Sequence, residues 1–180
     1  EGFEGEMFPP KCWEQWQIAS PDVVDSTSQG WGRNTNLTNF INRGNASAQL
    51  YNRAEGYKHI LVSPQFDFGE GGYRLSFWQY RNNGYTIKQK EGIRVLINDN
   101  PTTEGATELI YIKSNMLMSP EVYEAGFYKY NVDILSGGKQ YLIFEGISEN
   151  YTSSFIDDIE ISEIPECDEV SDFAVVDVLD

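Results

Sequence analysis

The chain has 180 residues, and its 13 Lys and Arg against 28 Asp and Glu give a formal net charge of −15. This length suits one sizeable domain, and the acidic balance argues against nucleic acid or anionic lipid as a partner, since both require a positive surface. No stretch approaches the roughly 20 apolar residues of a membrane span, so no membrane insertion is expected. The chain opens at Glu1 without an export signal, so we expect a mature product or an excised domain.

Strand-like segments recur along the chain. Each is a run of β-branched and aromatic residues bounded by Gly, Pro, Asn, Asp or Ser. In chain order these runs cover residues 16–19, 46–52, 59–62, 73–80, 93–98, 108–113, 127–135, 140–146 and 155–161. The best helical candidate, residues 118–125, would form two turns at most. The sequence therefore predicts an all-β protein, a two-sheet antiparallel β-sandwich of the jelly-roll type.

Two segments differ from this pattern. Residues 26–45 are rich in Asn, Thr and Gly, so we expect a long loop there rather than a core strand. Residues 160–180 are acidic and contain no Lys or Arg. We expect a jelly-roll module over residues 1–165, followed over residues 166–180 by an acidic linker or the start of another domain.

Two adjacent acids, Asp157 and Asp158, interrupt the last strand-like run, FIDDIEI. Strict alternation places Phe155, Asp157 and Ile159 on one face of the strand and Asp158 on the other. A carboxylate on the core face is costly unless a positive charge compensates it. The last forty residues contain no Lys or Arg, so a bound cation is a candidate for that charge.

A third carboxylate, Glu4, lies between two glycines in the opening GFEG run. Calcium takes about six to eight oxygen ligands from carboxylates, backbone carbonyls and water. The first and last strands of a jelly roll are commonly neighbours, which would bring Glu4 close to Asp157 and Asp158. The alternative is that Glu4 is a solvated acid at a strand end and that the Asp pair flanks a turn.

The two cysteines, Cys12 and Cys167, lie near opposite ends of the chain. A disulfide between them would close a loop of nearly the whole domain, which stabilises by roughly 4–5 kcal/mol in the chain-entropy model. Such a bridge indicates a compartment outside the cytoplasm. The alternative is two buried free thiols. With one histidine and no C-x-x-C pair, the sequence has no zinc-site pattern.

Signals for catalysis are weak. His59 is the only histidine and lies within a strand-like run, where a structural role is usual. No Ser or Cys lies in a nucleophile-elbow context, and the GEGG run at residues 69–72 lacks the Lys-Ser/Thr of a phosphate loop. Paired carboxylates for glycoside cleavage remain open, although no motif places two acids across a cleft. We expect no enzymatic activity.

Five motifs in order carry a family resemblance. They are GFE with FPPKCW (residues 2–4 and 8–13), LVSP (61–64), YRLSFW (73–78), YKYNVDI (128–134) and FIDDIEI (155–161). Together they resemble the cleaved-adhesin, or choice-of-anchor J, modules, which are MAM-like jelly-roll domains of exported bacterial adhesins. The opening and closing motifs are also similar to those of jelly-roll carbohydrate-binding modules.

This resemblance implies a structural calcium ion between the first and last strands. Its ligands would be Glu4 and Asp157 or Asp158, with backbone carbonyls from residues 22–32. The loop after Trp13 departs from the family because it lacks a repeated Asp-Gly pattern. A second calcium site is therefore in doubt, with Asp22 and Asp25 left as candidates. The resemblance also implies a bacterial protein that is secreted or located at the cell surface.

Ligand contacts in such a sandwich commonly involve exposed aromatic rings. Trp31 lies between two glycines in the polar segment and is the leading candidate, together with Tyr85 and Tyr151. Trp78 is a further candidate, but alternation in the LSFWQY run favours at least a partly structural role for it.

Our leading hypothesis is a non-catalytic, calcium-stabilised adhesion or ligand-binding module. It would bind a host or matrix protein or a glycan, and it would adjoin other domains of the same exported chain. One alternative is a carbohydrate-binding module appended to a polysaccharide-degrading enzyme, and another is an accessory domain with a purely structural role. A hydrolase is the least favoured hypothesis.

Overall fold

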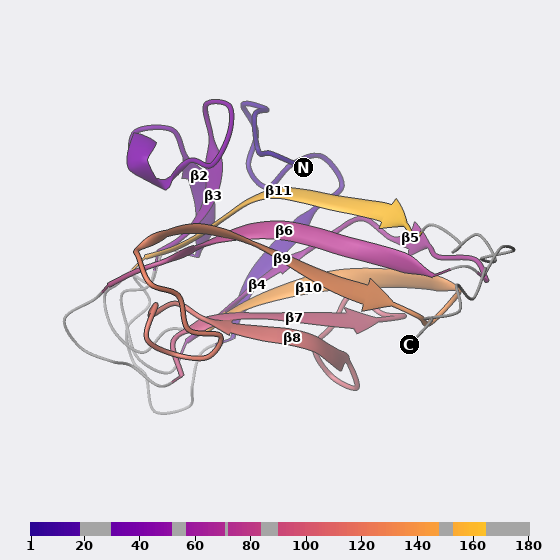
Figure 1. Cartoon of the computed structure of the whole chain (residues 1–180). Coiled ribbons are helices and arrows are strands. Elements are labelled where there is room, and N and C mark those ends of the chain that lie inside the picture. The colour runs from indigo at the N-terminus through magenta and orange to yellow at the C-terminus, as the bar shows by residue number, and fades with distance from the viewer. Residues whose placement is uncertain (19–29, 52–56, 71, 84–89, 148–152, 165–180) are drawn as a thin grey trace, which may run out of the picture.

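Two antiparallel sheets pack face to face in the computed structural model, which describes residues 1–18, 30–51, 57–70, 72–83, 90–147 and 153–164 (Figure 1). The first sheet has the order β1 (Glu14–Ile18), β4 (Lys58–Val62), β10 (Lys139–Ile147), β7 (Gly92–Asn98) and β8 (Thr107–Lys113), and β5 (Phe66–Asp67) pairs with β10. The second sheet has the order β2 (Trp31–Asn34), β3 (Ser47–Leu50), β11 (Ser154–Glu163), β6 (Tyr73–Arg81) and β9 (Gly126–Ile134). A short 3₁₀ turn, η1 (Thr38–Phe40), lies between β2 and β3.

Eight of these strands form a jelly roll. The order β4-β10-β7-β8 in the first sheet faces β3-β11-β6-β9 in the second, so the chain crosses repeatedly between the sheets. The last strand, β11, therefore lies between β3 and β6, in the middle of the second sheet. The predicted fold class is confirmed. The acidic segment 166–180 lies outside the described residues.

All nine predicted strands are present, with ends that differ by a few residues. Two other predictions are wrong. The segment 26–45 contains the strand β2, and residues 118–125 form turns and bends instead of a helix. The guanidinium of the buried Arg81 donates to the carbonyls of Pro120 and Met118 at 2.7 Å each, and a helix would need these carbonyls for its own N–H groups. No helix within the described ranges is long and apolar enough to cross a membrane.

The core between the sheets is aromatic and aliphatic, with Phe77 of β6 meeting Phe144 of β10 edge to face at 5.9 Å. Trp31 belongs to this core. It lies opposite Leu50 in the β2–β3 pair, is 4% exposed, and donates from Nε1 to the His59 carbonyl at 3.1 Å. The prediction of Trp31 as an exposed ligand-binding residue is therefore wrong, since strand alternation turns its side chain inward.

His59 is a buried residue of β4, and its ring stacks on Tyr57 at 6.0 Å. Neither ring nitrogen has a hydrogen-bond partner in the described structure. Burial disfavours the charged form and lowers the pKa of His59 to about 4.

This burial predicts a pH dependence of stability. The unfolded chain binds a proton at His59 as the pH falls below 6.5, whereas the folded chain does so only near 4. Wild type should therefore lose stability, on the order of 3 kcal/mol, as the pH falls from above 6.5 toward 4, relative to His59→Phe. Urea unfolding of both proteins across this range measures the difference. Two parallel pH profiles would show that the histidine does not titrate as described.

Candidate functional site

A β-bulge in β11 sets the position of the two adjacent acids. The register of β11 against β6 shifts between Asp157 and Glu160, and Asp158 has a φ of 48°, a left-handed conformation that Asp tolerates better than most residues. Asp157 lies opposite Trp78 on the outer face of the second sheet, whereas Ile156 and Ile159 belong to the core. The prediction that Asp157 and Ile159 share a face is wrong, because the bulge breaks the alternation.

Asp157 is nevertheless fully buried, because the loop between η1 and β3 covers it. Its Oδ2 accepts from the backbone N–H of Asn42 at 2.9 Å and of Arg43 at 3.4 Å. Its Oδ1 accepts from the N–H of Asp158 at 2.8 Å. Burial raises the pKa of Asp157 to about 6, and these hydrogen bonds oppose the rise. Backbone dipoles thus stabilise a carboxylate that water does not reach.

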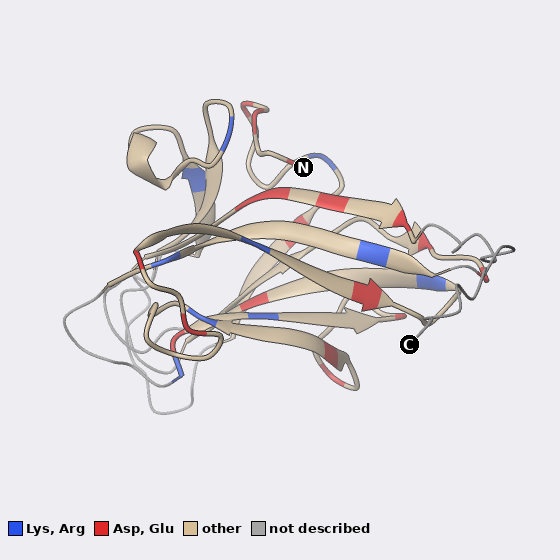
Figure 2. Ribbon diagram, in the orientation of Figure 1, with Lys and Arg blue, Asp and Glu red and all other residues tan. Residues whose placement is uncertain are grey.

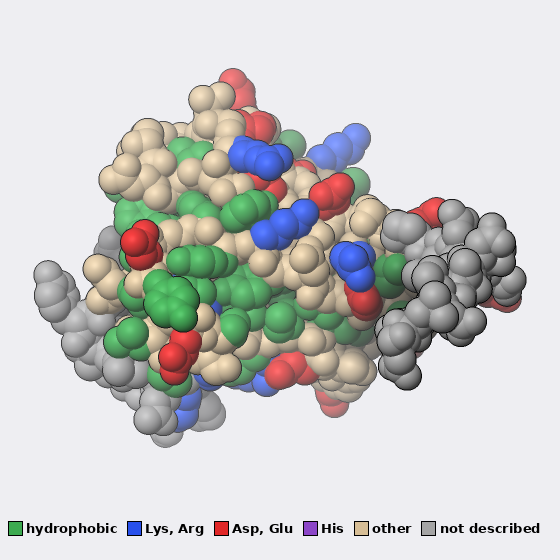
Figure 3. Space-filling model, viewed as in Figure 1, with side chains coloured by type: hydrophobic (Ala, Val, Ile, Leu, Met, Phe, Trp, Pro, Cys, Tyr) green, Lys and Arg blue, Asp and Glu red, His purple; other side chains and the backbone are tan. Residues whose placement is uncertain are grey.

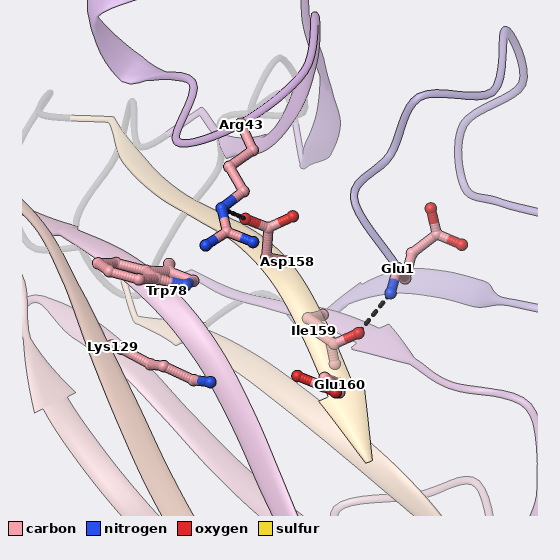
Figure 4. Close-up of a pocket in the computed structure, with 7 residues that line it drawn as sticks. All are labelled: Glu1, Arg43, Trp78, Lys129, Asp158, Ile159 and Glu160. Atoms are coloured by element: carbon pink, nitrogen blue, oxygen red, sulfur yellow. Dashed lines mark hydrogen bonds and ion pairs between the residues drawn. The ribbon is translucent and has the colours of Figure 1, made fainter. Parts of the chain in front are cut away.

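Asp158 contacts the same loop through side chains. Its Oδ2 accepts from Asn42 Nδ2 at 2.8 Å and lies 3.8 Å from Arg43 Nε (Figure 4). The Arg43 side chain is 75% exposed, so this ion pair contributes little to stability. Asn42 therefore bridges the two acids, with its backbone on Asp157 and its amide on Asp158.

Glu4 binds the other end of this loop. Both of its carboxylate oxygens accept from the N–H of Asn45, at 3.1 and 3.0 Å. Gly44 has a φ of +68°, and a Cβ atom added to it would lie 2.1 Å from Glu4 Oε1. Residues 42–45, Glu4, Asp157 and Asp158 form one unit, which we name the carboxylate clasp.

The first residues of the chain lie along β11 (Figure 1). The Ile159 N–H donates to the Glu1 carbonyl at 2.9 Å, and Arg33 of β2 donates to the carbonyls of Phe3 and Glu4 at 2.9 and 3.0 Å. A Cβ on Gly2 would lie 3.4 Å from Asp158 Oδ1 and 3.9 Å from Glu4 Cγ. The expectation that the first and last strands are neighbours is wrong, because β1 lies in the first sheet and β11 in the second. The three sequence-predicted acids instead contact residues 42–45, where the segment before β1 runs along β11.

The carboxylate oxygens of the clasp are hard ligands of the kind that calcium takes, and the backbone groups in contact with them are N–H donors. Burial raises the pKa of Asp157 to about 6, so a cation bound beside it would favour the charged form. Within the described residues, however, no three Asp, Glu, His or Cys side chains form a ready metal-binding group. Asp22, Asp25 and most of the carbonyls expected as ligands lie outside the described residues.

An open pocket of about 340 Å³ adjoins the clasp on the outer face of the second sheet (Figure 4). Its lining includes Asp158 and Arg43 of the clasp, together with Trp78 of β6, Lys129 of β9 and Glu160 of β11. Figure 2 shows the acidic residues distributed along β11 in this region. Sequence reasoning considered Trp78 but missed Arg43, Lys129 and Glu160, since only the sheet register brings β6, β9 and β11 together.

The other predicted residues do not join this site in the described structure. Tyr85, Tyr151 and Cys167 lie outside the described residues. Cys12 is exposed near the start of the chain, so its pairing with Cys167 remains a prediction.

The clasp predicts that substitution of one glycine, Gly44, lowers the free energy of unfolding more than substitution of a comparable glycine. Gly44→Ala should destabilise by about 1–2 kcal/mol more than Gly105→Ala, because both glycines have φ near +70° but only Gly44 contacts Glu4. Gly105 is the matched control, since nothing lies within 4 Å of its Cβ position. Urea unfolding measures both losses. Adding Glu4→Ala should reduce the excess cost, and an excess that persists without Glu4 would contradict this contact.

Comparisons with known proteins identify the fold. No family model and no curated protein sequence matches the chain. Among solved structures, the K1 cleaved adhesin domain of Lys-gingipain from Porphyromonas gingivalis W83 matches with a TM-score of 0.66 and 18% identity, over 92% of this chain and 97% of that one. The K2 cleaved adhesin domain matches at 0.62 and 16% identity, over 90% and 96%. A cyclase from Fischerella sp. TAU matches at 0.59 and 13% identity, over 91% and 94%. The chain therefore has the fold of the cleaved adhesin domains, over nearly their whole length.

Proposed function

We propose that this chain is a non-catalytic adhesion or ligand-binding module of an exported bacterial protein, and that calcium stabilises it. The observation that carries the binding function is the open pocket around Trp78, whose rim is fixed by the carboxylate clasp. The likeness to cleaved adhesin domains supports this proposal only at the level of fold, because a cyclase shares the same architecture.

The side chains around the pocket favour binding over catalysis. The only histidine of the chain, His59, is buried in β4 and is therefore unsuited to act as a surface base. Asp158 is engaged by Asn42 and Arg43. The pocket is open and mainly polar, so it does not exclude water from a bound ligand as active sites commonly do.

Calcium would act on the fold rather than on the ligand. Asp157, Asp158 and Glu4 are the side chains that would hold it, together with backbone carbonyls. The ion supplies positive charge to carboxylates that are otherwise stabilised by N–H donors and one exposed Arg. Binding only to the folded chain, it would raise stability by mass action and fix the first segment to β11.

Calcium should therefore raise the melting temperature, and EDTA should lower it, by roughly 5 °C or more at millimolar calcium. The double variant Asp157→Asn with Asp158→Asn should lose this response. Asp99→Asn, a change in an exposed turn after β7, is the matched control and should keep it. Differential scanning calorimetry measures the shift. If neither calcium nor EDTA changes the melting temperature of the wild type, the metal site is refuted. The clasp is then held by hydrogen bonds alone.

Adhesion is tested with beads that carry the purified chain. The beads should be retained on a surface coated with extracellular matrix protein or with glycan at least about tenfold more than beads coated with albumin. Multivalent display raises weak affinities into a measurable range. Equal retention of both kinds of bead on every surface would rule out the binding function.

A further inference from the structure

Aromatic side chains line one half of the outer face of the second sheet. Phe40 stacks on Phe155 at 4.4 Å and meets Tyr80 edge to face at 4.7 Å, and Phe127 lies 5.4 Å from Tyr80. By strand alternation, Trp78 lies on the same face of β6 as Tyr80, two residues before it. Figure 3 shows hydrophobic side chains gathered on this face, with charged side chains around them. These packed rings lie on the same face of the sheet as Trp78 but do not contact its ring.

The ring of Trp78 is available to a ligand. It is partly exposed, lines the pocket, and makes no ring contact with another described aromatic residue. A flat, partly exposed indole gives an apolar surface and a polar N–H at one edge. Such a ring suits a ligand that has one apolar face and polar groups around its edge.

Charged side chains of both signs surround this ring. Lys129 lies directly opposite Trp78 in the β6–β9 pair, and Glu160 lines the pocket from β11. Neither side chain forms a hydrogen bond or ion pair with another residue in the described structure. Arg43 and Asp158 add one further charge of each sign, and Glu1 adds a third carboxylate. The pocket thus offers both donors and acceptors, and it has no excess of cations that would favour an anion.

Other classes of ligand fit this surface less well. β6, which carries Trp78, is paired on both sides, with β11 and with β9, so an extended peptide cannot add a strand beside it. The centres of protein interfaces are depleted in charged residues, whereas five charged side chains line this pocket together with Trp78. A hydroxyl-rich ring matches the site better, because each hydroxyl both donates and accepts.

We propose that this pocket binds a neutral saccharide, which stacks on Trp78 and hydrogen-bonds to Lys129 and Glu160. This inference rests on the proposed binding function and names its ligand class and contact residues. The rim formed by Arg43 and Asp158 connects the site to the clasp, so the same loop that covers Asp157 also shapes the sugar site.

Isothermal titration calorimetry with soluble tetrasaccharides tests the proposal. Cellotetraose, xylotetraose, mannotetraose and chitotetraose are the neutral probes, and tetragalacturonate is the acidic probe, all at millimolar concentration. At least one neutral probe should bind, and Trp78→Ala should weaken that binding at least about tenfold. Tyr123→Ala is the matched control, since Tyr123 is 99% exposed and does not line this pocket, and it should leave the affinity unchanged.

A second variant guards against misfolding of Trp78→Ala. The double variant Lys129→Ala with Glu160→Gln keeps the indole and should weaken the same probe by about tenfold. Binding that survives both variants, binding of the acidic probe alone, or no binding of any neutral probe would overturn the proposal. If the beads still adhere to a protein-coated surface while no saccharide binds, the binding function stands and this inference fails.

Discussion

A carboxylate removed from water needs other partners for its charge, and Asp157 has them in the backbone of the loop after η1 and of its own neighbour in β11. Its two oxygens accept three N–H groups, from Asn42, Arg43 and Asp158. Leaving such a group buried and unpaired would cost far more than the net gain of an ordinary hydrogen bond. The conformation of residues 42–45 is therefore tied to the bulge in β11, and Glu4 ties the same loop to the start of the chain.

This arrangement connects stability to binding. Asp158 and Arg43 belong to the clasp and also line the pocket, so the loop that covers Asp157 fixes one side of the proposed ligand site. The opposite side is formed by β6 and β9, whose register brings Lys129 against Trp78. A ligand that contacts both sides would bind the loop in its clasped position. Calcium at the clasp would favour that same position, so metal and ligand would reinforce each other by linkage.

The strands and the acid pair were predictable because local patterns encode them. Runs of β-branched and aromatic residues marked nine strands, and two acids within an apolar run marked a site. The strand β2 was not predicted, because its four residues, WGRN, include one apolar side chain. The burial of Trp31 depends on the pairing of β2 with β3, which no local pattern shows. The bulge in β11 was not predicted, because it is defined by the register between β11 and β6. Trp78 and Lys129 are 51 residues apart, so no local pattern unites them.

The three carboxylates hold residues 42–45 against the folded sheet. Amide hydrogen exchange at single-residue resolution tests this arrangement directly, because the N–H groups of Asn42, Asn45 and Asp158 all donate to these carboxylates. Slow exchange, at rates comparable to those of the paired amides of β11, is the predicted result. Exchange at the rate of an exposed loop would contradict the account.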